Sequence, residues 1–183
     1  MLACAAVALA AAPAVTGARA KFHALAIGAY PRGSRVPITM RELNDYLAAE
    51  IPVMIGPGVR HVRIETATGN IVRGTADIDF LKVRQAQGEK PGWLLSQILD
   101  GERPVAITVR LTSAHGTARV DVLKVEISGA VAEGKTLDFL ISHFVVPTFP
   151  DIKIGKTFIM AYNIDQIEIQ PNQAVVVLRG LVR

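Results

Sequence analysis

The sequence predicts an α+β fold in which a strongly curved antiparallel sheet is wrapped around a central apolar helix. The first observation is that apolar and polar residues alternate over several segments, which is typical of half-buried strands. The second is the segment 134–150, whose apolar residues cover most of a helix, so this helix needs cover on more than one side. The third is a break in the alternation of two strands, which indicates β-bulges and therefore bent strands.

Length and composition favour a single domain. The chain has 183 residues, half of them hydrophobic, and a formal net charge of +4. This is enough apolar material for a substantial core. The basic residues are scattered and are not interleaved with aromatic residues, so we expect no nucleic-acid partner. The mild positive charge is compatible with transient contact with an anionic membrane surface.

The first 20 residues predict a cleaved signal peptide. Residues 2–12 form an apolar run that is too short for a membrane span, and Ala-Arg-Ala at 18–20 has the pattern of a cleavage site. We therefore expect residues 1–20 to be a signal peptide and residues 21–183 to form one α+β domain in the periplasm or outside the cell. The only cysteine, Cys4, lies in this leader, so the mature chain would have no disulfide and no thiol ligand.

The first helix after the leader has clear start and stop signals. Thr39 and Glu42 stand three residues apart just before apolar residues at helical spacing, which predicts a capping box. The predicted helix covers about residues 40–50 and ends before Pro52. The preceding residues, 21–36, have no clear period and are expected to form a short strand or an extended arm.

Three hairpins are predicted in the rest of the chain. They cover residues 59–80, 105–127 and 158–178, and a second helix and the central helix separate them. The first hairpin is predicted to turn at Gly69-Asn70. The alternation changes phase near Val122-Leu123 and again near Asp165-Gln166, which predicts one β-bulge in each of the last two hairpins. The closing strand is apolar on both faces and is expected to be buried or central.

Side chains capable of chemistry form no recognised catalytic motif. The four histidines are far apart and none belongs to a zinc-binding pair, and the G-x-S-x-G elbow of serine hydrolases is absent. Asp77 and Asp79 form a D-x-D pair, which could hold a cation or serve as a glycosidase pair. Their alternation with Ile78 and Phe80 favours a solvated sheet face instead. We therefore expect no enzymatic activity, no metal and no cofactor.

Several segments resemble one protein family. The segment ITMRELNDYL (38–47), the segment VPTFPDIKIGKTF (146–158) and the closing strand pair are similar in layout to small exported bacterial proteins related to the tubular lipid-binding (TULIP) superfamily. The resemblance spans residues 38–179. It implies a long helix in a bent sheet that binds lipid in the resulting groove, with no catalytic residues to carry over. This chain is long enough for one such module.

The expected function is therefore lipid binding in the cell envelope, with an acyl chain held in an apolar groove between helix and curved sheet. The same apolar side chains could be used up in the core, and an alternative is a periplasmic structural or adaptor domain that binds another protein. The residues expected to line the groove are Trp93 on the second helix, Phe139, Leu140 and Phe144 on the central helix, Phe149 after it, and Phe158 and Met160 on the next strand.

Overall fold

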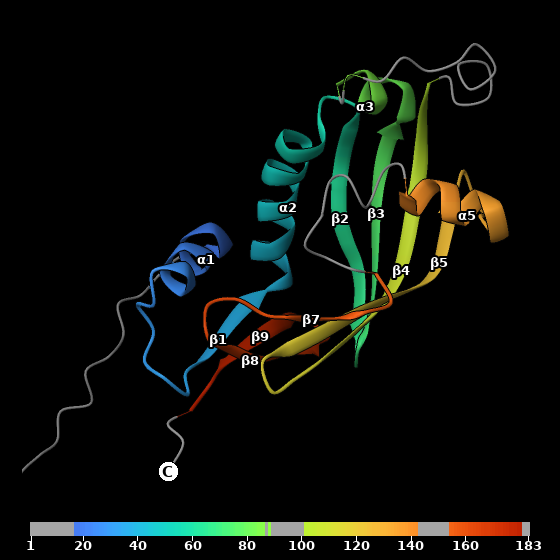
Figure 1. The fold of residues 1–183 in the computed structure, drawn as a ribbon. Helices are drawn as coiled ribbons and strands as arrows, with labels where there is room; N and C mark the ends of the chain where they lie inside the picture. Colours follow the sequence, from blue (N-terminus) through green and yellow to red (C-terminus); the bar gives the residue numbers. More distant parts are fainter. Residues whose placement is uncertain (1–16, 87, 89–100, 143–153, 181–183) are drawn as a thin grey trace, which may run out of the picture.

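Two antiparallel sheets and the helices packed on them form the computed structural model, which describes residues 17–86, 88, 101–142 and 154–180 (Figure 1). The larger sheet comprises β2 (Val59–Thr68), β3 (Ile71–Asp79), β4 (Glu102–Ala114), β5 (Thr117–Ile127), β6 (Ala130–Val131) and β7 (Thr157–Ile159). Strands β2 to β6 lie in chain order, and β7 pairs with β5. The smaller sheet comprises β1 (Arg35–Thr39), β8 (Ile164–Gln170) and β9 (Gln173–Leu178), with β9 in the centre. The predicted α+β class with antiparallel sheets is confirmed.

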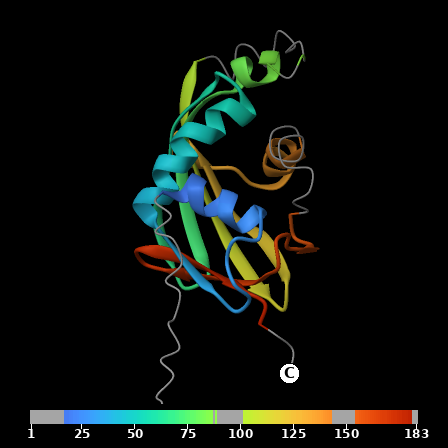
Figure 2. The same ribbon diagram turned by 90° about the vertical axis from the view of Figure 1, so that its left-hand side faces the viewer.

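Four described helices accompany the sheets: α1 (Ala18–Ala26), α2 (Met40–Ile55), α3 (Phe80–Ala86) and α5 (Gly134–Leu140). Helix α2 runs alongside β2, and α1 lies next to the first turns of α2 (Figures 1 and 2). Helix α5 lies off one face of the larger sheet, and the smaller sheet lies at one end of β2 to β5 (Figures 1 and 2). Among the described residues, no helix is long and apolar enough to cross a membrane.

The expected strong curvature of the sheet is wrong, because the larger sheet is not strongly curled. In the described part of the chain, it is also not seen to wrap around α5 (Figure 2). The reason is that the last strands belong to a different sheet. β8 and β9 join β1 in a separate sheet and do not extend the larger one, so their bend adds nothing to its curvature. A bulge bends its own strand locally and cannot close a sheet whose remaining strands go elsewhere.

Both predicted bulges are present. In the β4–β5 pair, Thr108 faces Lys124 and Val109 faces Val122, so Leu123 is the extra residue. In the β8–β9 pair, Ile164 faces Leu178 and the next pair begins at Gln166, so Asp165 is the extra residue. The turn at Gly69-Asn70 and the buried central position of β9 are confirmed as well.

The predicted capping box begins α2. The Glu42 amide donates to the Thr39 hydroxyl (3.2 Å), and the Glu42 carboxylate accepts from the Thr39 amide (2.8 Å). The predicted end of this helix is wrong, because Pro52 lies inside it and the helix ends at Ile55, with Gly56 as its C-cap. A proline in the last turn of a helix removes only one backbone hydrogen bond, because it has no amide hydrogen. The next turn still forms, since the Gly56 amide donates to the Pro52 carbonyl (3.0 Å).

Gly58 brings the end of α2 close to the start of α3. A Cβ atom on Gly58 would lie 2.6 Å from the Asp79 carbonyl oxygen and 2.9 Å from the Val83 amide nitrogen. Both are backbone atoms, so only glycine fits here without moving the chain. The segment 55–58 is therefore a tight turn that leads from α2 into β2.

Helix α1 replaces the strand or arm expected upstream of β1. It packs on the smaller sheet, where Ala18 and Leu25 join Val36, Ile38 and Val176 in a buried cluster. The Lys21 ammonium contacts the Glu42 carboxylate (2.8 Å), and Arg19 contacts Glu50. Cleavage after Ala20 stays a prediction. It would cut α1 and remove the buried Ala18, but would leave the contact between Lys21 and α2.

The larger sheet has its own core. Phe80, Val125 and Ala132 are buried, and apolar residues of β3, β4, β5 and α5 pack against them. The tip of the β4–β5 hairpin links this core to the smaller sheet, because the Ser113 hydroxyl bonds both the amide and the carbonyl of Ile167 (2.8 and 3.0 Å). The Ser113 side chain thus joins the two sheets by satisfying both backbone groups of Ile167.

Candidate functional site

An apolar groove lies on one face of the larger sheet, between α2 and α5. It has a volume of about 240 Å³ and is lined by residues of α2, β2, β3, β4 and β5, by Phe80 at the start of α3, and by Ile141 directly after α5. Its apolar lining consists of Leu47, Val62, Ile64, Ala76, Ile78, Phe80, Val105, Ile107, Val125, Ile127 and Ile141. Gly74, Thr75 and Arg63 complete the described lining, and Arg63 is its only charged member.

The groove follows from strand alternation. Ala76 pairs with Val105, and Val105 pairs with Ile127 on the next strand. Directly paired residues share a face of the sheet, so these side chains form one apolar row across three strands. Gly74 and Ile107 belong to the neighbouring row. Because Gly74 has no side chain, the surface is hollowed at this row.

Most of the groove lining is only partly buried. Phe80 and Val125 are buried, whereas Ile64, Ile107 and Ile141 are half-buried. A sealed core of this size would bury nearly all of its aliphatic side chains. The described part of the groove is therefore an open apolar surface that an elongated apolar ligand could cover.

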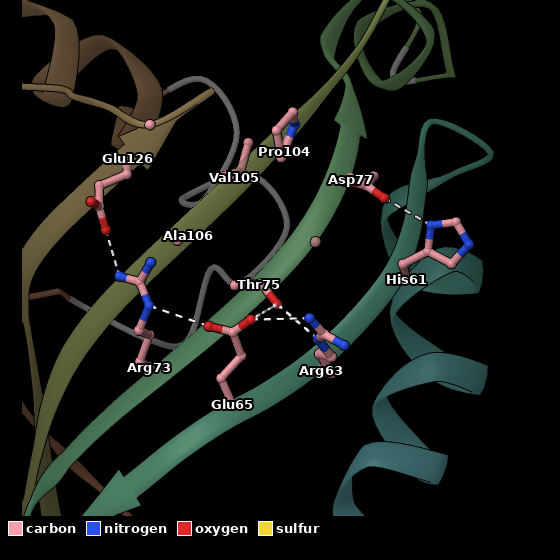
Figure 3. Close-up of a pocket in the computed structure, with 12 residues that line it drawn as sticks. His61, Arg63, Glu65, Arg73, Thr75, Asp77, Pro104, Val105, Ala106 and Glu126 are labelled. Atoms are coloured by element: carbon pink, nitrogen blue, oxygen red, sulfur yellow. Dashed lines mark hydrogen bonds and ion pairs between the residues drawn. The ribbon is translucent and has the colours of Figure 1, made fainter.

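The opposite face of the same strands carries a charged hollow of about 510 Å³ (Figure 3). Arg73 lies in its middle and bridges two carboxylates, Glu126 (Nη1–Oε2 2.5 Å) and Glu65 (Nε–Oε2 3.3 Å). Glu65 also contacts Arg63 (3.1 Å), and Glu126 also contacts Lys124 (2.9 Å). Acidic and basic side chains thus alternate across β2 to β5.

The electrostatics of this hollow favour the ionised state of Glu126. Hydrogen bonds from Arg73 and then from Lys124 hold the pKa of Glu126 below its ordinary value. The bond to Glu126 in turn raises the pKa of Arg73. Glu126 and Arg73 therefore stabilise each other in their charged states.

The D-x-D pair does not form one solvated pair, and this corrects the expectation for Asp79. Asp79 is buried with 9% of its surface exposed, and its carboxylate accepts from the Lys82 amide (3.1 Å) at the start of α3. Burial opposes its ionisation, but the ammonium and amide of Lys82 outweigh it, so the pKa of Asp79 lies below its ordinary value. Asp77 is half-buried and faces His61 on β2 instead (2.8 Å).

Because Asp79 caps α3, Asp79→Ala is expected to lower the free energy of unfolding by about 1 kcal/mol. Asp77→Ala is the matched control on the same strand, and it should change stability by less than about 0.5 kcal/mol because it removes only an exposed pair. Urea denaturation followed by circular dichroism measures both. Equal effects of the two variants would show that the cap contributes nothing.

The residues predicted to line a groove are only partly described. Trp93, Phe144 and Phe149 lie outside the described residues, and Phe139 and Leu140 are placed on α5 by their backbone alone. Phe158 is half-buried on β7, and Met160 is buried just after it, and neither lines the apolar groove on the described face. The structure thus brings none of the seven into this groove by a described side chain, and their role in binding stays a prediction.

Most residues that line the groove were predicted from the sequence as apolar positions on half-buried strands, and not as ligand contacts. The available signal was the alternation itself, because Val62, Ile64, Val105 and Ile107 all fall on apolar rows. Alternation cannot distinguish a row that is covered from one that is left open. Ile141, in contrast, belongs to the apolar stripe of the segment expected to be the central helix.

The chain matches no protein-family model, no curated protein and no solved structure.

Proposed function

We propose that this protein is an exported, non-enzymatic lipid-binding protein of the cell envelope that holds an acyl chain in the apolar groove. The observation that carries the proposal is the lining: among the described residues, eleven apolar ones and a single charged one surround about 240 Å³ of space. An acyl chain is the natural occupant of a long, open and almost wholly apolar surface. The TULIP resemblance of the sequence points to the same ligand class.

The size of the groove limits the affinity. A volume of about 240 Å³ accepts about eight groups the size of a water molecule or a methylene. Each buried methylene contributes about 0.8 kcal/mol, so the gross gain is about 6 kcal/mol before the cost of association. The proposed ligand is therefore a medium-length acyl chain, or part of a longer one, bound with modest affinity.

Arg63 is the one charged residue among the described residues that line the groove, and it also lines the charged hollow. Its guanidinium donates to Glu65 (3.1 Å) and to the Thr75 hydroxyl (3.3 Å) on the charged face, so it is directed away from the groove. The proposed orientation places the acyl tail along the Val105 and Ile107 rows, with no ion pair between the ligand and Arg63.

Ile107→Glu is expected to weaken binding of a naturally fluorescent polyene fatty acid by at least about tenfold, because a carboxylate in the groove must be desolvated by the acyl chain. The protein should still melt cooperatively, since Ile107 is half-buried in an open surface. Fluorescence titration and thermal melting measure the two effects.

Val109→Glu is the matched control. Val109 is also half-buried, lies two residues further along β4 and is not among the described residues that line the groove. It should disturb the sheet to a similar degree and leave the affinity for the fatty acid unchanged. Wild-type protein that binds no probe, or two variants that lose binding equally, would refute the proposal.

A second candidate is a structural or adaptor domain that binds another protein. It is favoured by Val53 and Met54 at the end of α2, which are 81% and 55% exposed. Adjacent exposed apolar residues on a helix are typical of a contact surface. This candidate applies if the wild-type protein binds no fatty acid.

A further inference from the structure

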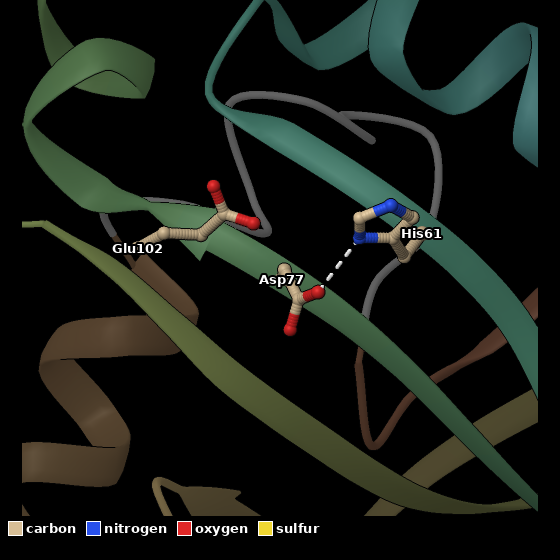
Figure 4. Close-up of side chains that lie close together, drawn as sticks. All are labelled: His61, Asp77 and Glu102. Carbon is tan, nitrogen blue, oxygen red and sulfur yellow. Dashed lines mark hydrogen bonds and ion pairs between the residues drawn. The ribbon is translucent and has the colours of Figure 1, made fainter.

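Three potential metal ligands converge at one end of the charged hollow, and they come from three neighbouring strands. His61 on β2, Asp77 on β3 and Glu102 on β4 each offer one ligand atom, and these atoms lie within 4.8 Å of one another (Figure 4). We propose that these three residues bind one divalent transition-metal ion, with Zn²⁺ as the preferred ion. The site is independent of the acyl groove, which lies on the opposite face of the sheet.

A bulge in β2 places His61 in this group. Arg60 pairs with Asp77, but the next pair is Arg63 with Thr75, so His61 and Val62 together oppose a single residue. In a regular strand successive side chains alternate between the two faces, so His61, directly after Arg60 on the polar face, would point to the apolar face. The bulge instead keeps His61 on the polar face, with φ at 51°, and returns Val62 to the groove.

The imidazole is therefore held beside a carboxylate. His61 Nδ1 lies 2.8 Å from Asp77 Oδ2, and Figure 4 shows the ring and the carboxylate facing each other. The side chain of His61 is 74% exposed, whereas those of Asp77 and Glu102 are 33% and 29% exposed. The two carboxylates are thus anchored at the sheet surface, and the imidazole side stays open to solvent.

The spacing is compatible with a three-ligand zinc site. Zinc bonds to nitrogen and oxygen of about 2.0–2.1 Å in tetrahedral geometry place ligand atoms about 3.3 Å apart. The closest pair here must open by about 0.5 Å from 2.8 Å, and the widest, which is at most 4.8 Å, must close by no more than about 1.5 Å. Rotation of partly exposed side chains can supply both changes, and a water molecule would take the fourth position.

The ligand types select the ion. A site with an imidazole and two carboxylates favours zinc or a neighbouring transition metal, whereas Ca²⁺ and Mg²⁺ prefer oxygen ligands only. The two carboxylates have ligand atoms within 4.8 Å of each other, and like charges at this distance repel, so a cation bound between them would be favoured.

Arg60 competes with the metal ion for the Glu102 carboxylate. Its guanidinium contacts the Glu102 carboxylate, so a metal ion must displace it from that oxygen. Removal of the guanidinium should therefore strengthen metal binding. A group of ordinary surface ion pairs would not show this behaviour, since loss of Arg60 would then change nothing but local charge.

The test is isothermal titration calorimetry of the purified protein with zinc chloride at neutral pH. Wild-type protein is expected to bind one Zn²⁺ per chain. His61→Gly and Asp77→Asn should each weaken binding by at least about tenfold, and Arg60→Gln should strengthen it several-fold. Glycine is chosen at position 61 because it adopts the positive φ without strain.

His115→Gly is the matched control. His115 is also exposed and left-handed (φ 50°), but it lies in the turn between β4 and β5, outside the metal-ligand group found among the described residues. This variant should bind Zn²⁺ as the wild type does, and thermal melting checks that every variant is folded. The proposal is overturned if the wild type binds no Zn²⁺, if His115→Gly weakens binding as much as His61→Gly, or if Arg60→Gln weakens it.

Discussion

Ile38→Ala is expected to lower the free energy of unfolding by about 2–5 kcal/mol, the range for a large-to-small change in a closed core. Ile38 lies on β1 and is only 1% exposed. Its side chain belongs to the buried cluster that joins α1 to the smaller sheet through Val36, Val176 and Leu178. The loss combines the transfer free energy of three carbons with the cavity that they leave.

Ile159→Ala provides the control for Ile38→Ala. Ile159 is also a strand isoleucine, on β7, but it is 81% exposed. Its truncation should change the free energy of unfolding by less than about 0.5 kcal/mol. Urea denaturation of both variants measures the difference. If the two variants were equally stable, the cluster around Ile38 would not be a core.

Glu42→Ala is expected to lower the free energy of unfolding by about 3 kcal/mol at neutral pH, because two supports are lost together. The first is the carboxylate half of the capping box at Thr39. The second is the ion-pair partner of Lys21, whose side chain is only 15% exposed and would keep only its hydrogen bond to the Pro37 carbonyl (2.7 Å). Glu42→Gln should cost less, since a glutamine can still accept from the Thr39 amide.

The same residue predicts a pH dependence. The hydrogen bond from Lys21 lowers the pKa of Glu42 to about 2 from an ordinary 4.5; burial opposes this shift, and the Thr39 amide and hydroxyl support it. Because the folded-state pKa is the lower one, the stabilisation is present above about pH 4.5 and is lost as the pH falls towards 2. The stability gap between wild type and Glu42→Gln should therefore close over this window. A gap that stays constant from pH 5 to pH 2 would contradict the assignment.

Local signals predicted the elements whose determinants are close in sequence. The capping box at Thr39 and Glu42, the Gly69-Asn70 turn and the extra residues near Leu123 and Asp165 all depend on a few adjacent residues, and all are present in the structure. Helix α1 was missed because its residues carry no clear period, and its stability comes from packing on β1 and β9. Propensity alone does not reveal a helix that is stabilised by tertiary contacts.

The partners of each strand were decided only by the tertiary structure. The apolar patterns of β8 and β9 show that both are strands, but they do not identify the strand that lies beside each one. Their pairing with β1 in a second sheet could therefore not be predicted. The same limit applies to both candidate sites. The apolar rows at Val105 and Ile107 were visible in the sequence, whereas their incomplete cover was not. Asp77 was singled out with its neighbour Asp79, but the chain directs Asp79 to cap α3 and brings His61 and Glu102 to Asp77 from other strands. Sequence spacing determines which side chains share a strand face, and only the packing of distant strands determines which of them meet.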